Sequence, residues 1–171
     1  IGIESTIIKL DDISNKPLIV RKGMIDKSKL EKNLGYKFSY QKNNNSKLNI
    51  PGNSKNHYCP NAILLITKNI KKRINNFLRI GLKIGIIIFN NFNKLINKNI
   101  ISIEISCHEN IYAKNLYNNL RFFDKNKVDI IMIEKIPQNE KWFGIRDRIY
   151  KASIKKEHLI IFKNLKKNLI N

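Results

Sequence analysis

Cysteine and long hydrophobic runs are both scarce in this chain of 171 residues. The two cysteines, Cys59 and Cys107, lie far apart and form no CxxC pair, which is typical of a reduced, cytoplasmic compartment rather than of a disulfide framework. The longest apolar run, Ile84–Phe89, has the length of a strand and is too short to span a membrane. The sequence therefore predicts a cytoplasmic protein without a membrane segment.

Several catalytic signatures are also missing. The sequence contains no P-loop, no GxGxxG pattern and no Ser-His-Asp set. Cys107, His108 and Glu109 are metal-ligand types, but three adjacent residues cannot all point at one ion from a strand or a helix. We therefore expect no metal site formed by the side chains of this chain.

Acidic residues are few. The chain has 13 Asp and Glu against 33 Lys and Arg, which gives a formal net charge of +20. Such an excess suggests nucleic acid or an anionic surface as a partner. However, Ile, Asn and Lys are enriched together along the whole chain and Arg is scarce, as in proteins from AT-rich genomes. Since no RNA-binding motif is present and the basic residues do not cluster with aromatics, we favour compositional bias and expect at most weak, nonspecific RNA contact.

Residues 1–35 predict a strand, a turn, a second strand and a helix. Asp26 is suited to cap the start of this helix, and Gly35 to end it. Two strands and one helix cannot bury a core by themselves. This segment is therefore interpreted as the C-terminal remnant of a larger domain.

The rest of the chain divides into three parts. Residues 36–61 are polar and low in complexity and predict a linker. Residues 62–153 alternate apolar strands with helices, which predicts a parallel sheet covered on both faces, a small three-layer, Rossmann-like α/β domain. Residues 154–171 form a basic tail.

Candidate binding residues fall into a series of short motifs in the first sixty residues. Each has an ordinary explanation: Ser5 and Thr6 suit a strand, Arg21 suits a solvated edge, and the pair His57-Tyr58 suits a loop. Each also has a chemical one. The hydroxyls can donate to a carboxylate or phosphate, the guanidinium can grip a phosphate, and the two rings can stack on a nucleotide.

The order and spacing of these motifs resemble threonylcarbamoyl-AMP synthase in its two-domain form, with a YrdC-like catalytic domain, a linker and a small C-terminal domain. The motifs are Glu4-Ser5-Thr6, Arg21-Lys22-Gly23, Pro51-Gly52 and His57-Tyr58, and helices resembling the family's at 112–124 and 144–152 extend the likeness to about residue 153. The family has a proline where this chain has Lys22, and a basic residue where it has Asn56.

The resemblance implies an enzyme that joins L-threonine, bicarbonate and ATP, with Mg²⁺, into threonylcarbamoyl-AMP for the modification of tRNA. It implies that Ser5, Thr6, Arg21, His57 and Tyr58 bind ATP or threonine, and that the family's main substrate clamp belongs to an N-terminal part outside this sequence. We therefore expect the C-terminal portion of this nucleotidyltransferase, inactive alone. The alternatives are a basic nucleic-acid-binding α/β module and an inactive gene fragment.

Overall fold

The N-terminal part of the chain forms a small three-stranded sheet with one helix. The structure, a computed structural model, describes residues 3, 5–10, 17–41, 59–89 and 97–153. Strands β1 (Ile7–Lys9) and β2 (Leu18–Arg21) pair in antiparallel fashion, and β3 (Ser39–Tyr40) adds to β2 in parallel. Helix α1 (Lys27–Leu34) connects β2 to β3, and Leu30 packs in a minor core with Ile19 and Phe38.

Helix α1 begins and ends where its sequence predicts. The Asp26 side chain accepts a hydrogen bond from the Lys29 N–H at 2.8 Å, which satisfies one of the free donors at the helix start. Gly35 lies in the left-handed region with φ of 72°, and its N–H donates to the Glu31 carbonyl. The caps predicted at Asp26 and Gly35 are confirmed.

Strand β3 is a difference from the sequence-based prediction. It lies inside the segment 36–61, which is predicted to be a linker, and its two residues align with Leu18 and Ile19 of β2. Two residues give no detectable strand period, so the pairing depends on the neighbouring strand rather than on a local pattern. The sheet therefore extends beyond residue 35.

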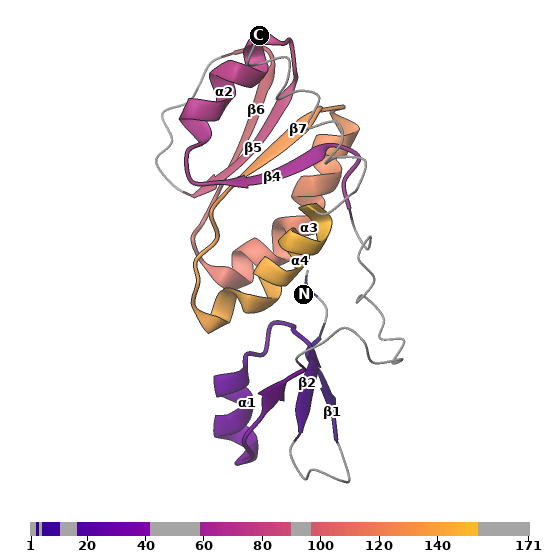
Figure 1. Ribbon diagram of the computed structural model, residues 1–171, viewed down its shortest axis with the longest axis vertical. Coiled ribbons are helices and arrows are strands. Elements are labelled where there is room, and N and C mark those ends of the chain that lie inside the picture. The colour runs from indigo at the N-terminus through magenta and orange to yellow at the C-terminus, as the bar shows by residue number, and fades with distance from the viewer. Residues whose placement is uncertain (1–2, 4, 11–16, 42–58, 90–96, 154–171) are drawn as a thin grey trace.

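The C-terminal part is a four-stranded parallel sheet between layers of helix. Its strands are β4 (Ile63–Thr67), β5 (Ile84–Phe89), β6 (Ile100–Ile105) and β7 (Ile130–Glu134), in the spatial order β4-β7-β5-β6. Helix α2 (Ile70–Arg79) covers one face, while α3 (Glu109–Lys125) and α4 (Phe143–Ser153) cover the other (Figure 1). A short 3-10 turn, η1 (Glu140–Trp142), precedes α4. The predicted three-layer parallel α/β domain is confirmed.

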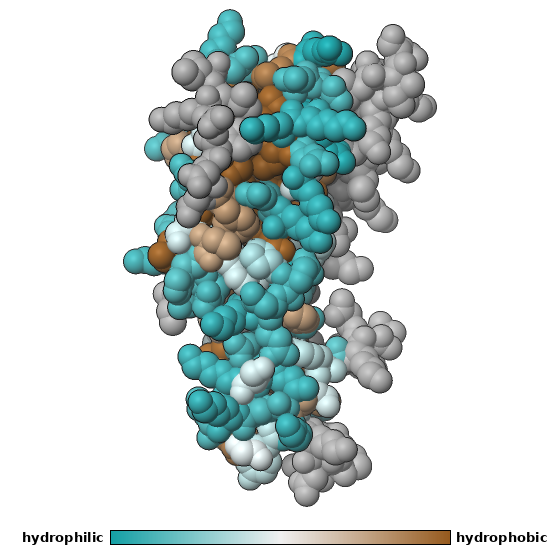
Figure 2. Space-filling model, turned by 90° about the vertical axis from the view of Figure 1, so that its left-hand side faces the viewer, coloured by the Kyte–Doolittle hydropathy of each residue, from teal (hydrophilic) through white to brown (hydrophobic). Residues whose placement is uncertain are grey.

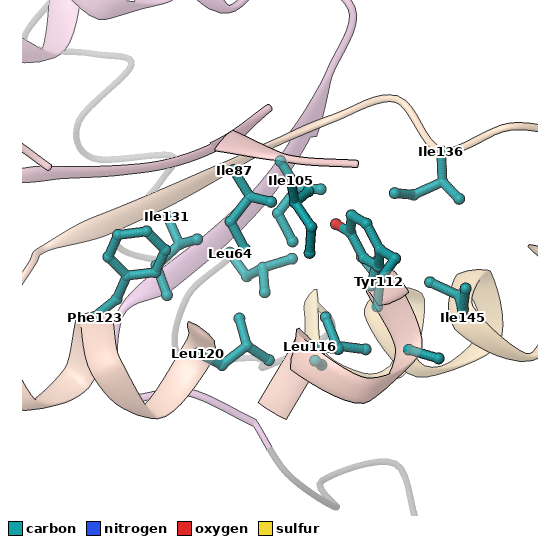
Figure 3. Packing of buried hydrophobic residues seen from close by; sticks show 14 of the residues in the cluster. Leu64, Ile87, Ile105, Tyr112, Leu116, Leu120, Phe123, Ile131, Ile136 and Ile145 are labelled. Atoms are coloured by element: carbon teal, nitrogen blue, oxygen red, sulfur yellow. The ribbon is translucent and has the colours of Figure 1, made fainter. Parts of the chain in front are cut away.

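The core follows from the alternation of side chains along the strands. In β5, Ile84, Ile86 and Ile88 pack toward α2, whereas Ile87 packs toward α3 and α4. Figure 3 shows the hydrophobic cluster on the face covered by α3 and α4, in which Tyr112, Leu116, Leu120 and Phe123 of α3 lie against strand residues. Both faces of β5 and β7 are buried, which explains why these two strands are nearly continuous apolar runs.

Ile3 joins the two parts of the chain, because it is buried in the cluster beneath α4. No helix in the described ranges has the length and apolar character needed to cross a membrane. The predicted basic tail, 154–171, lies outside the described residues.

Candidate functional site

Three of the five predicted site residues come together at the start of the chain. Arg21, at the end of β2, donates from Nε to the Ser5 carbonyl oxygen at 3.0 Å and from Nη2 to the Ser5 hydroxyl at 3.0 Å. Ser5 itself is exposed, whereas Arg21 is 7% exposed. The alternative of Arg21 as a solvated edge residue is therefore wrong, because its guanidinium is buried against Ser5, just before β1.

Thr6 holds the loop that follows Arg21 by two hydrogen bonds. Its hydroxyl donates to the Ile25 carbonyl oxygen at 2.7 Å and accepts from the Gly23 N–H at 3.2 Å. One hydroxyl thus bridges both ends of the turn between β2 and α1. Ser5 and Thr6 fix the two sides of the loop that carries Arg21 and Gly23.

The chemistry of this cluster suits an anion rather than a cation. A guanidinium and a hydroxyl are among the groups that proteins use to hold carboxylates and phosphates. Among the described residues, no group of three or more His, Cys, Asp or Glu side chains could hold a metal ion.

A contact that the sequence did not predict lies directly beside Arg21. The Lys22 ammonium lies 4.0 Å from the centre of the Phe143 ring and 5.5 Å from that of Tyr40. The two rings stack, with centres 5.0 Å apart and planes 17° apart. Burial lowers the pKa of Lys22, and Asp147 opposes that shift. Residues 22, 40 and 143 are far apart in sequence, so no local pattern connects them.

His57 and Tyr58 lie outside the described residues, but the ends of the segment that carries them are visible. Before it, the Gln41 N–H donates to the Ile19 carbonyl of β2 at 3.2 Å. After it, the Cys59 thiol lies 3.6 Å from the Lys151 carbonyl oxygen of α4. Gln41 thus lies beside β2 of the small sheet, and Cys59 lies beside the last turns of α4.

A second feature is a basic hollow at the carboxyl end of β4 and the start of α2. Its volume is about 480 Å³. Its lining includes the exposed side chains of Lys68, Lys72 and Arg73, together with Asn69 and Asn76. The face of the molecule that carries α2 is coated mostly with hydrophilic residues (Figure 2). This hollow was not predicted, because the lysines are spread so widely along the chain.

Comparison with known proteins decides the family. The sequence model of the family "Threonylcarbamoyl-AMP synthase, C-terminal domain" matches residues 23–153, more than half of the chain. The chain belongs to this family. The match includes the loop after Arg21, the segment around His57 and the whole parallel-sheet domain, so the resemblance predicted from the short motifs is confirmed.

Two relatives have the name threonylcarbamoyl-AMP synthase. The Bacillus subtilis protein is 30% identical over 164 residues, which are 90% of this chain and 46% of the relative. The Pyrococcus abyssi protein is 26% identical over 165 residues, again 90% of this chain and 46% of the relative. The chain thus spans about half the length of these relatives.

Solved structures show the same fold. The crystal structure of Pyrococcus abyssi Sua5 complexed with L-threonine superimposes with a TM-score of 0.72 at 24% identity, covering 89% of this chain and 46% of that one. A variant of that protein with an adjacent histidine and tyrosine replaced by alanine gives 0.69 at 23% identity, covering 89% and 45%. At this identity the likeness establishes the fold.

Proposed function

We propose that this chain supplies the C-terminal part of an L-threonylcarbamoyladenylate synthase, a nucleotidyltransferase that joins L-threonine, bicarbonate and ATP into threonylcarbamoyl-AMP and pyrophosphate for the modification of tRNA. The observation that carries this proposal is the family match over residues 23–153. Cys59 and Cys107 form no disulfide within the described part of the chain, which fits the reduced cytoplasm as the site of action.

Arg21 and Ser5 give the proposal a chemical basis. In the reaction, a threonine carbamate attacks the α-phosphate of ATP and pyrophosphate leaves. Such chemistry depends on positioning and on neutralising negative charge. We propose that the Arg21 guanidinium and the Ser5 hydroxyl hold an anionic group of threonine or ATP, that Thr6, whose hydroxyl proton is donated to the Ile25 carbonyl oxygen, orders the loop beside that group, and that His57 and Tyr58 cover the nucleotide. Mg²⁺ would arrive with ATP, and no described residue is assigned to it.

The experiment uses the chain with and without a complementary part. The portion of the Bacillus subtilis relative that precedes the matched region would be fused ahead of this chain, and pyrophosphate release would be measured with ATP, threonine and bicarbonate. The 171-residue chain alone should release no pyrophosphate above background. The fusion should release it only when all three substrates are present. A fusion that folds but releases none would contradict the proposal.

The basic hollow favours one second candidate, a nucleic-acid-binding role. Lys68, Lys72 and Arg73 present positive charge on one rim, and such charge gives salt-sensitive, sequence-independent binding. Binding of tRNA and random RNA would be compared for Lys72→Ala/Arg73→Ala and for a charge-matched control on α1, Lys29→Ala/Lys32→Ala. Synthase function predicts weak binding, lowered equally by both pairs. Tight, tRNA-selective binding lost only with the hollow pair would favour the second candidate.

A further inference from the structure

The loop Arg21–Gly23 is in contact with the start of α4, which belongs to the other part of the molecule. A Cβ built on Gly144 would lie 2.5 Å from the carbonyl oxygen of Gly23 and 3.0 Å from its carbonyl carbon. Both are backbone atoms, so they cannot rotate aside as a flexible side chain would. The loop and the helix therefore pack at a distance that only glycine at 144 permits.

The aromatic contact beside this point also joins the two parts. Tyr40 comes from β3 of the small sheet and Phe143 is the first residue of α4, and the Lys22 ammonium lies over their stacked rings. A cation over an aromatic face is attracted by the ring quadrupole, more strongly when water is excluded. Lys22 is partly buried, so this contact is partly shielded from solvent.

Two further contacts strengthen the same junction. The Ser28 hydroxyl of α1 donates to a carboxylate oxygen of Glu140 in η1. Met24, next to Gly23, packs against the hydrophobic cluster beneath α4. Lys22, Gly23, Met24 and Ser28 therefore each contact η1, α4 or the hydrophobic cluster beneath α4.

If this loop moved, it would shift the candidate site through two sets of hydrogen bonds. The Gly23 N–H donates to the Thr6 hydroxyl, and Arg21, two residues earlier, holds Ser5. Lys22, between Arg21 and Gly23, lies over the rings of Tyr40 and Phe143, so this contact also holds the loop.

We propose that the parallel-sheet domain positions the Arg21 loop, with Phe143 and Gly144 as positioning residues that act through Lys22 and Gly23. The proposal assigns a role to a domain that itself contributes no predicted substrate contact. The effect of this positioning on catalysis rests on the proposed synthase function. The packing of the loop against α4 does not.

The first test needs only the chain as it exists. Hydrogen exchange of the Gly23 amide would be compared for the parent, Lys22→Met, Lys22→Arg and Phe143→Leu, with the exposed Phe122→Leu of α3 as control. Loss of the ring contact should speed Gly23 exchange roughly 3- to 10-fold, while β5 and β7 amides stay protected. Lys22→Arg, which keeps a cation over the ring, should restore protection. Unchanged Gly23 exchange in Lys22→Met would overturn the proposal.

The second test uses the fusion enzyme and separates the two claims. Gly144→Ala and Lys22→Met should raise the Michaelis constant for threonine or ATP by roughly 5-fold or more, as expected for a displaced binding group, and Lys22→Met should do so with the melting temperature nearly unchanged. Lys22→Arg should return it toward the parent value. An inactive parent fusion would contradict the synthase function alone. An active fusion whose Michaelis constants do not respond to these variants would contradict the positioning role alone.

Discussion

Arg21 holds Ser5 by two hydrogen bonds, from Nε to the carbonyl oxygen and from Nη2 to the hydroxyl, each 3.0 Å long. The planar guanidinium presents both donors at once, so one side chain fixes both the backbone and the hydroxyl of Ser5. These two hydrogen bonds tie the residues just before β1 to the end of β2 at the candidate site.

Replacement of Arg21 should therefore destabilise the N-terminal sheet. Arg21→Met leaves two acceptors without their charged donor, and we expect a loss of about 1.5–3 kcal/mol in the free energy of unfolding. Arg21→Lys should recover only part of the lost stability, because an ammonium cannot make both hydrogen bonds to Ser5 as the planar guanidinium does. Urea denaturation measures both. The exposed Arg79→Lys on α2 serves as control and should stay within about 0.5 kcal/mol of the parent.

Gly85 should not tolerate a side chain. A Cβ there would lie 2.6 Å from Cδ1 of the fully buried Phe123 ring, so Gly85→Ala should cost about 1–3 kcal/mol of stability through overpacking. Thermal unfolding would show it as a lower melting temperature. The double variant Gly85→Ala/Phe123→Leu should be less destabilised than the sum of the single variants, because the smaller side chain makes room. Additive effects would contradict the proposed clash.

Glu31 should make α1 sensitive to acid. A hydrogen bond from the Phe38 N–H holds the pKa of Glu31 below its ordinary value; desolvation opposes this shift, and nearby Lys27 and Lys37 add to it. Because the folded-state pKa is lowered, this contribution to stability is present above the ordinary pKa and is lost as pH falls through the lowered one.

The Phe38 amide provides the measurement for that prediction. Its chemical shift should titrate with a pKa below the ordinary glutamate value, and Glu31→Gln, which keeps an acceptor without a titrating proton, should flatten the curve. A titration at or above the ordinary value would mean that the hydrogen bond does not favour the charged form.

The pair His57-Tyr58 should matter for ATP more than for threonine. If the rings cover the nucleotide, His57→Ala or Tyr58→Ala in the fusion enzyme should cost about 1–2 kcal/mol, which raises the Michaelis constant for ATP several-fold. Turnover should fall as well if the segment closes and opens in each cycle. Lys47→Ala, in the same segment but outside the motif, should be neutral. If the Michaelis constant for ATP is unchanged in both motif variants, the segment only connects the two parts and His57 and Tyr58 do not bind the nucleotide.

The parallel-sheet domain could be predicted from the sequence because its signals are local. Ile84–Phe89 is a continuous apolar run, and Ile70, Ile74 and Phe77 repeat at helical spacing, so each element is specified by its own residues. The same holds for the caps at Asp26 and Gly35. These features need no knowledge of what packs against them.

The contacts that build the site could not be predicted in this way. The strand Ser39–Tyr40 is too short to show a period, and the stack of Tyr40 on Phe143 joins residues about a hundred positions apart. Arg21 and Ser5 were both singled out, but only the antiparallel pairing of β1 with β2 brings them together. Long-range pairing of this kind depends on the assembled fold.

The most direct test of the central claim is the identity of the product. The fusion enzyme would be incubated with ATP, threonine and ¹³C-labelled bicarbonate, and the mixture analysed by mass spectrometry. The account predicts an AMP adduct that contains threonine and one labelled carbon, absent when any substrate is omitted and reduced in Arg21→Met. Threonine-independent ATP cleavage, or an adduct without the label, from a folded fusion would contradict it.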